Sequence, residues 1–291
     1  MPRSTAPLRL GPTFPVRNLR FAIDLAHAPA HWHGAGPAVT RFFDNLSIFF
    51  PAGEAFFVQS LKHYAAELTD PELQAAVRAF CAQEGHHMRE HRRYNAFLAA
   101  QGLPAAALEA RVGRVLGLVR RYLPPRHQLA ITCALEHFTA IMAAEVLSDP
   151  RILADCHPAL ADLWRWHAIE ESEHKAVAHE VFKTVGGTEA ERAVYMLVTT
   201  LIFWALVIDQ QVRFSQADAS LRGPRQGLRG AAHLLRHLFI APGNLRRMGG
   251  PWRAWFRPGF HPWQHDNRAH IEAMVADLEA RHAGTPLAEA S

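Results

Sequence analysis

Apolar residues recur along most of this chain at every third or fourth position, the spacing that places them on one face of a helix. Alanine and leucine are abundant and runs of β-branched residues are few, which favours helices over strands. The pattern therefore predicts an all-α protein. The expected helices cover about residues 39–68, 71–101, 105–122, 126–147, 159–184 and 264–282.

Helix-breaking residues divide the main helices into two pairs. Asp70-Pro71 supplies a capping side chain and a proline suited to a first helical turn. Residues 148–158 hold the strongest breakers of their region. The first two helices should therefore form one antiparallel hairpin, and the helices on either side of 148–158 a second. Within the first helix, Pro51 and Gly53 predict a kink or a restart just before Glu54.

Acidic residues interrupt the apolar faces of these hairpins in two copies of one pattern. Each copy is a lone Glu followed 30 or 35 residues later by Glu-x-x-His, and the midpoint falls at the predicted turn. Residues three apart share a helix face, so each Glu-x-x-His should point two side chains towards the lone Glu. A carboxylate among apolar neighbours is costly to bury unless it is paired or binds a metal. These residues are Glu54, Glu84, His87, Glu136, Glu171 and His174.

This set resembles the metal ligands of the ferritin-like di-iron carboxylate superfamily, which includes desaturases, ribonucleotide reductase small subunits and bacterial monooxygenases. More narrowly, Phe49–Glu54, Gln83–His87 and Glu90–Asn95 resemble a bacterial family labelled "predicted metal-dependent hydrolase", and the likeness covers about residues 15–215. The resemblance implies an all-α, ferritin-like four-helix bundle with a di-metal centre. It implies two divalent ions, with iron expected before manganese and zinc.

Other polar residues lie close to the expected ligands. His91 is one turn past the first Glu-x-x-His, and His167 is one turn before Glu171, so each is a candidate extra ligand or a partner of a ligand. Glu170 is the alternative bridging carboxylate and a candidate catalytic group. Thr139 either lines a substrate pocket, where it could take part in catalysis, or bonds its own helix.

Three functions remain open from the sequence. The favoured hypothesis is an O2-dependent oxidase, oxygenase or desaturase that acts on a small apolar substrate, acyl or lipid-like. The alternative is a metal-dependent hydrolase that uses a hydroxide bridging the two ions, with Glu170, Glu173 or His91 as base. The third is non-catalytic metal binding or iron storage, although ferritin cages lack a long C-terminal extension rich in arginine and tryptophan.

Composition narrows the cellular compartment and the partners expected for this protein. The chain has 291 residues, a formal net charge of +4 and 3 cysteines. An odd number of widely spaced cysteines indicates free thiols in a reducing compartment. No apolar segment typical of a secretory signal stands at the N-terminus, so a cytoplasmic location is expected. The modest charge and the lack of a nucleic-acid motif give no reason to expect nucleic acid as a partner.

The chain divides into an N-terminal arm (1–38), a di-metal helical bundle (39–215) and a basic, aromatic-rich helical extension (216–291). Residues 193–208 form an uncharged run of 16, which is short for a membrane span and favours a core or homodimer helix. Between residues 213 and 257 nine arginines accompany one acid, with aromatic residues among them. That composition is typical of an interfacial segment, so contact with a membrane surface through 213–263 is a further alternative.

Overall fold

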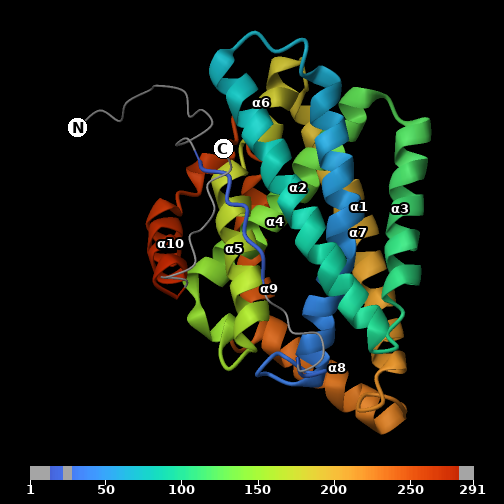
Figure 1. Ribbon diagram of the computed structural model, residues 1–291. Coiled ribbons are helices and arrows are strands. Elements are labelled where there is room, and N and C mark those ends of the chain that lie inside the picture. Colours follow the sequence, from blue (N-terminus) through green and yellow to red (C-terminus); the bar gives the residue numbers. More distant parts are fainter. Residues whose placement is uncertain (1–13, 22–27, 282–291) are drawn as a thin grey trace.

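The structure, a computed structural model, describes residues 14–21 and 28–281 of the chain. These residues form ten α-helices and two short 3-10 helices joined by loops, and no strand occurs among them (Figure 1). The predicted all-α class is confirmed.

Four long helices form the centre of the molecule. α1 spans Pro37–Tyr64 and α2 spans Pro71–Ala100, while α4 spans Pro125–Ser148 and α5 spans Pro158–His174. α1 packs against α2, α4 packs against α5, and the two pairs meet through α1 with α4 and α2 with α5. Both expected hairpins are therefore present, and their inner faces enclose one space.

The other elements cover this centre. They are α3 (Ala105–Tyr122), η1 (Pro150–Leu153), α6 (Val177–Thr184), α7 (Glu189–Ala217), α8 (Pro224–Phe239), α9 (Asn244–Ala254), η2 (Pro262–Gln264) and α10 (Arg268–Arg281). α3 links the two hairpins and packs along α1, and α7 packs on both α1 and α4. α10 lies against α5 on the opposite side of the molecule from α3 (Figure 1).

Local chemistry explains where several helices begin. The Asp70 side chain accepts a hydrogen bond from the backbone N–H of Glu72 at 2.9 Å, and Pro71 occupies the first helical turn of α2. Thr188 and Glu191 form a reciprocal capping box at the start of α7. Such caps satisfy N–H groups that have no partner within the helix.

Two helix boundaries differ from the sequence-based expectation. α1 continues through Pro51 as one helix, so Glu54 lies in a helix interior and the predicted restart is wrong. The expected helix 159–184 is divided, because α5 ends at His174 and α6 begins at Val177. At this break the Lys175 ammonium donates to the backbone oxygen of His265 at 2.7 Å, which ties the C-terminal segment to the end of α5.

The N-terminal arm runs along the bundle without forming a helix between Phe14 and Phe21. Residues 19–21 form neither a helix nor a strand. The backbone N–H of Phe21 donates to the Glu90 carboxylate of α2 at 3.3 Å. This contact holds the arm against the outer side of α2.

The uncharged run 193–208 lies in α7. It does not form a fully buried core helix, so that prediction is wrong. Met196 and Phe203 face inwards, whereas Leu201 is 73% exposed and Ile208 63% exposed. By length and composition alone, α4 and α7 are each apolar enough to cross a membrane, but only 28% of the most apolar window of α7 is buried against 72% for α4. Core helices pass the same test, so this is weak evidence for a span.

The aromatic residues of the C-terminal segment are mostly buried. Trp255, Phe260 and Trp263 are each at most 5% exposed, and the Trp255 ring lies 4.6 Å from the ring of His137 on α4. These side chains attach the C-terminal helices to the bundle, so they are not available to a membrane surface. All three cysteines are free, as the sequence predicts.

Candidate metal centre

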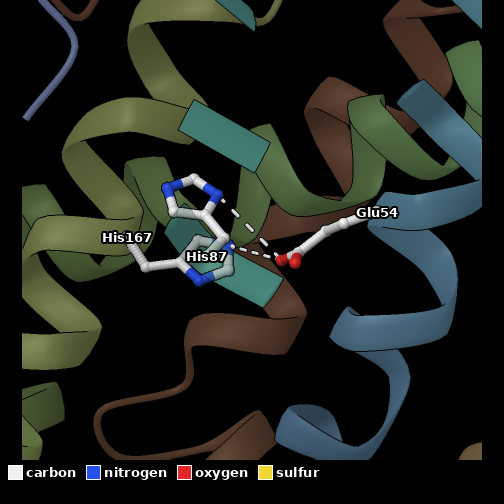
Figure 2. Close-up of side chains that lie close together, drawn as sticks. All are labelled: Glu54, His87 and His167. Atoms are coloured by element: carbon white, nitrogen blue, oxygen red, sulfur yellow. Dashed lines mark ion pairs between the residues drawn. The ribbon is translucent and has the colours of Figure 1, made fainter. Parts of the chain in front are cut away.

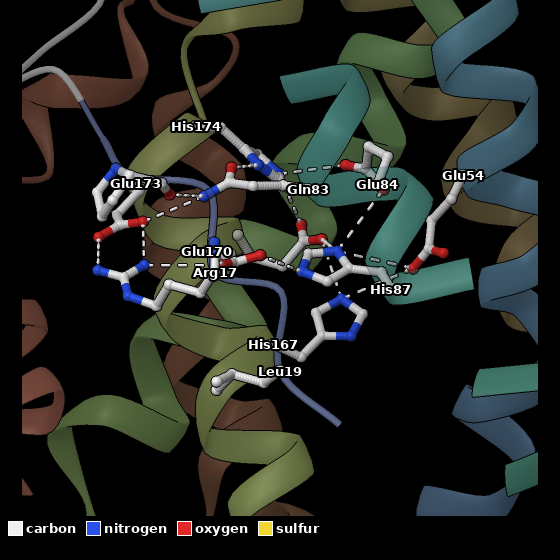
Figure 3. A network of polar contacts seen from close by, with 12 residues as sticks. Arg17, Leu19, Glu54, Gln83, Glu84, His87, His167, Glu170, Glu173 and His174 are labelled. Carbon is white, nitrogen blue, oxygen red and sulfur yellow. Dashed lines mark hydrogen bonds and ion pairs between the residues drawn. The ribbon is translucent and has the colours of Figure 1, made fainter. Parts of the chain in front are cut away.

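Four helices bring carboxylates and imidazoles into one buried cluster. α1 contributes Glu54, α4 contributes Glu136, and α2 and α5 each contribute a Glu-x-x-His pair. Each of the side chains is at most 2% exposed. The cluster consists of Glu54, Glu84, His87, Glu136, Glu171 and His174. All six residues selected from the sequence therefore meet inside the bundle. Figure 3 shows Glu54, Glu84, His87 and His174 of this cluster.

The hydrogen bonds of His87 determine which of its nitrogens faces the cluster with a lone pair. Its Nε2 lies 3.0 Å from the Glu170 carboxylate, which also accepts the backbone N–H of Arg17 at 3.2 Å. A carboxylate only accepts, so Nε2 carries the proton in the neutral ring. Nδ1 then has a lone pair, and it lies 3.7 Å from Glu84 and 3.6 Å from Glu171.

The same argument applies to His174. Its Nδ1 lies 2.9 Å from Oε1 of Gln83, and the amide nitrogen of Gln83 is engaged as a donor to Glu173 and to the backbone oxygen of Pro15. Oε1 is therefore the acceptor, and Nδ1 of His174 carries the proton. The unprotonated Nε2 points inwards, 3.3 Å from Glu84 and 3.6 Å from Glu136. Both imidazoles thus turn a lone pair towards the carboxylates.

The inward-facing atoms share a second property, because they lack hydrogen-bond partners among the described residues. These atoms are both oxygens of Glu54, Glu84 and Glu136, Oε2 of Glu171, Nδ1 of His87 and Nε2 of His174. Buried polar atoms without partners are rare and destabilising. Two ligands at about 2.1 Å from one ion and about 110° apart are separated by about 3.4 Å, close to the distances above. The donor set therefore fits divalent cations.

The pKa values of the carboxyl groups show what happens without cations. Burial, with repulsion from neighbouring carboxylates, raises the pKa of Glu54, Glu84 and Glu136 well above the ordinary range. Burial acts in the same direction on Glu171, but interactions with the His174 and His167 imidazoles outweigh it and hold its pKa well below that range. The cluster favours protons on three of its acids unless a cation replaces them.

His167 joins the cluster from α5. Its Nε2 is 3.0 Å from Glu171 and 3.9 Å from Glu54, and its ring stacks on His87 with centroids 4.1 Å apart (Figure 2). Its other nitrogen, Nδ1, lies 2.7 Å from Nε2 of His91. His91 is fully buried rather than exposed, and its contact is with His167 instead of the carboxylates.

A chain of hydrogen bonds behind His91 fixes the direction of these protons. The Asn95 amide donates to Glu109 at 2.8 Å, so its oxygen must accept, and it does so from the Ser47 hydroxyl at 2.8 Å. Ser47 in turn accepts from Nδ1 of His91 at 2.9 Å. Nε2 of His91 then accepts from Nδ1 of His167, which leaves Nε2 of neutral His167 with a lone pair facing the cluster.

Glu170 and Thr139 lie at the edge of the cluster. Glu170 faces the outer nitrogen of His87 and lies 3.7 Å from the Arg17 guanidinium, so it orients the imidazole from outside rather than bridging the carboxylates (Figure 3). Thr139 bonds its own helix and also lines a cavity. Its hydroxyl donates to the backbone oxygen of Glu136 at 3.0 Å, and the cavity is apolar.

That cavity connects the cluster with the α3–α7 side of the bundle. It has a volume of about 110 Å³, and Glu54 is its only charged lining residue in the part of the chain that the structure describes. It is lined by the buried side chains of Phe57 and Phe138 and by Ile202 of α7, which is 46% exposed. A second cavity of about 50 Å³ shares Thr139 and reaches Glu171 and His167. Apolar space therefore touches the cluster on the side of α1 and α4.

In a second group of possible metal ligands, atoms that could face an ion already have hydrogen-bond partners. His179, Glu180 and His261 lie close enough to hold an ion. However, Nδ1 of His261 accepts the backbone N–H of Trp263 at 3.2 Å, so Nε2 carries a proton and donates to Glu180 at 3.0 Å. His261 and Glu180 thus form a hydrogen-bonded pair, and only Nδ1 of His179 in this group lacks a partner among the described residues, so we assign no metal to it.

Two residues that support the cluster were missed in the sequence. Gln83 orients His174, and its neighbour Glu84 could have drawn attention to it. Arg17 forms two 2.8 Å hydrogen bonds with Glu173 and approaches Glu170, yet nothing in the arm sequence indicates this role. Both residues act through other side chains rather than within the cluster.

We expect Gln83→Leu to weaken metal binding about 10- to 100-fold, the usual effect of removing a side chain that orients a histidine ligand. The substitution leaves Nδ1 of His174 without its acceptor, so the ring can adopt the wrong tautomer. Competition with a chromophoric chelator measures the affinity. An exposed amide on another helix, changed by Gln226→Leu, provides the control, and equal affinities for the two variants would contradict the orientation of His174.

The comparison with known protein families agrees with the metal-binding chemistry that the geometry of the cluster indicates. The family model described as "Predicted metal-dependent hydrolase" matches residues 15–266, which extends beyond the expected limit near 215 and includes α7, α8 and α9. Neither a curated protein nor a solved structure gives a match to the chain. Because the family model covers most of its length, the chain belongs to the predicted metal-dependent hydrolase family.

Proposed function

We propose that the cluster binds two divalent metal ions in a ferritin-like arrangement of α1, α2, α4 and α5. One ion would be held by Glu54 and Nδ1 of His87, and the other by Glu136 and Nε2 of His174. Glu84 and Glu171 lie within 4 Å of both imidazoles, so they are the shared carboxylates. The observation that carries the proposal is that the atoms without hydrogen-bond partners are the ones that face this shared space.

His167 is proposed as a third imidazole ligand, on the side of Glu54. In the neutral ring its Nε2 lone pair faces two carboxylate oxygens, an unfavourable contact without a proton or a cation between them. Burial lowers the pKa of His167 to about 4, which disfavours the proton. A cation satisfies the same contact without that cost.

We place hydrolysis first among the reactions because the family carries that description and the cluster has the donors to hold two ions. Such ions supply a Lewis-acidic centre that activates water and polarises a carbonyl group. The chain's own part is to bind and orient the substrate: the cavity fits an apolar chain, and Thr139 lies where the two cavities meet. Glu170 is assigned a positioning role, because its carboxylate is engaged by His87 and the arm.

Oxidation of an apolar substrate by O2 is the second candidate. The observation that favours it is the cavity lining, which offers little to hold water beside Glu54. Iron would be the metal in that case, whereas zinc suffices for hydrolysis. Manganese fits the same donors.

The two reactions are separated by loading metal-stripped protein with Zn²⁺ or, without air, with Fe²⁺. For hydrolysis we expect the zinc form to cleave p-nitrophenyl esters of medium-chain fatty acids, with no cleavage after Glu171→Ala. Consumption of O2 by the iron form, measured with an oxygen electrode and accompanied by no ester cleavage in either form, would instead support oxidation. Failure of Glu171→Ala to reduce metal content would contradict the metal centre itself.

A further inference from the structure

The outer face of α7 is an exposed apolar surface. Its residues recur at intervals of three and four along one side of the helix, and each is at least 42% exposed. They are Val194, Leu197, Val198, Leu201, Ile202, Ile208 and Val212, with Ile202 at the edge of the stripe. An apolar face of this length on a water-soluble helix generally marks an interaction site.

This surface continues onto α8 across a groove. Ile208 and Val212 of α7 line the groove on one side, and Leu228, Leu235 and Phe239 of α8 line it on the other. The groove has a volume of about 840 Å³, and the three α8 side chains are 73%, 56% and 43% exposed. The two helices therefore present one apolar surface, which we call the α7–α8 face.

Arginines border the α7–α8 face. Arg225, Arg229 and Arg236 lie at spacings of four and seven, so they share one side of α8, next to the stripe that contains Leu228 and Leu235. All three are exposed, and none forms an ion pair within the described part of the chain. α8 contains no acidic residue. The helix thus combines a core side, an apolar exposed side and a cationic side.

We propose that the α7–α8 face docks on a lipid surface that carries anionic headgroups. Exposed leucines beside arginines are the features of helices that lie in a membrane interface, where apolar side chains enter the acyl region and arginines bind headgroup phosphates. A second copy of the chain is a poorer occupant, because a symmetric contact would bring the arginine stripes of two α8 helices together.

The α7–α8 face borders the cavity that reaches the cluster. Val198 and Ile202 belong to the α7–α8 face, and both line the cavity that ends at Glu54. An acyl chain that leaves the lipid surface therefore has an apolar route to the candidate metal centre. This step, which assigns a lipid-like acyl substrate, rests on the proposed function, whereas docking itself requires no metal.

Sedimentation of the full-length protein with vesicles tests the docking. We expect it to sediment with phosphatidylcholine vesicles that contain phosphatidylglycerol, and less with pure phosphatidylcholine. Changing Arg225, Arg229 and Arg236 to Gln should weaken binding to the anionic vesicles about 100-fold at low salt. Leu201→Asn with Leu235→Asn should weaken it as well. Circular dichroism verifies that each variant is folded.

The matched control changes three arginines outside the face to Gln and removes the same charge. They are Arg78, Arg268 and Arg281. Equal loss of binding in this control would overturn the proposal, as would a wild-type protein that stays in the supernatant with anionic vesicles. A solution dimer that the leucine substitutions dissociate would assign the face to a second copy instead. Metal content, measured on the same samples, separates failure of docking from failure of the metal centre.

Discussion

Loading the metal-free protein with Zn²⁺, or with Fe²⁺ in the absence of air, should raise its melting temperature by about 10 °C. A ligand at about 1,000 times its dissociation constant stabilises the folded state by about 4 kcal/mol. For a chain of this size each kcal/mol corresponds to about 2–4 °C. Ca²⁺ serves as the control, because it prefers more oxygen ligands and gains little from imidazoles. Differential scanning calorimetry gives the result, and equal effects of Ca²⁺ and Zn²⁺ would contradict a site built with histidines.

The increase in melting temperature on metal loading should depend on pH. Folding raises the pKa of Glu54, Glu84 and Glu136. A raised carboxyl pKa stabilises the fold fully below the unfolded value near 4.3, and this contribution is lost as the pH rises through the folded value. Folding lowers the pKa of Glu171, so the stabilisation from this residue is lost as the pH falls. Since metal ions replace the protons on the three acids, the increase in melting temperature should be larger at about pH 8 than at about pH 5.5.

The sequence identified the centre of the cluster because hairpin geometry leaves little freedom there. Once a turn is placed near Asp70, a Glu at 54 and a Glu at 84 must lie at the same level of two paired helices. The cost of burying an unpaired carboxylate then indicates which acids matter. The second hairpin follows the same rule, although a longer connection with η1 joins its helices.

Features that depend on packing between distant segments were not predictable. Pro51 was expected to interrupt α1, yet the helix continues through it and packs against α2, α3, α4 and α7. Hydropathy could not show that one side of α7 is exposed, since an apolar helix has the same composition in a core and on a surface. Arg17 reaches α5 from an arm without regular structure, so no periodic pattern indicates its contact with Glu173.

The hydrogen bonds around the histidines gave information that no sequence pattern contains. Spacing suggested His91 and His167 as equivalent candidates, one turn from a predicted ligand in each helix. In the structure only His167 reaches the carboxylates, while His91 lies behind it and accepts a hydrogen bond from its Nδ1. The difference arises from Ser47 and Asn95, which belong to other turns of α1 and α2 and fix the orientation of His91.

Replacing Glu136 with Leu should affect the metal-free and metal-loaded proteins in opposite directions. In the metal-free protein Glu136 is 1% exposed, and neither of its oxygens has a hydrogen-bond partner among the described residues. Exchange of such a buried group for an apolar side chain is commonly stabilising by about 1–4 kcal/mol, so the melting temperature should rise by about 5 °C. At the same time the protein should lose about half of its bound metal, measured by elemental analysis, because Glu136 is proposed as a ligand of one ion only.

Glu90 provides the matched control for this substitution. It is equally buried and lies on α2, but its carboxylate accepts from Arg89 at 2.7 Å and from Arg93 at 2.9 Å. Glu90→Leu removes a paired charge, so it should destabilise the protein in both forms while leaving the metal content unchanged. If Glu136→Leu instead destabilised the metal-free protein as Glu90→Leu does, Glu136 would be a structural carboxylate, and its assignment as a ligand would be wrong. A buried acid that weakens the fold when metal is absent is explained only by what it binds.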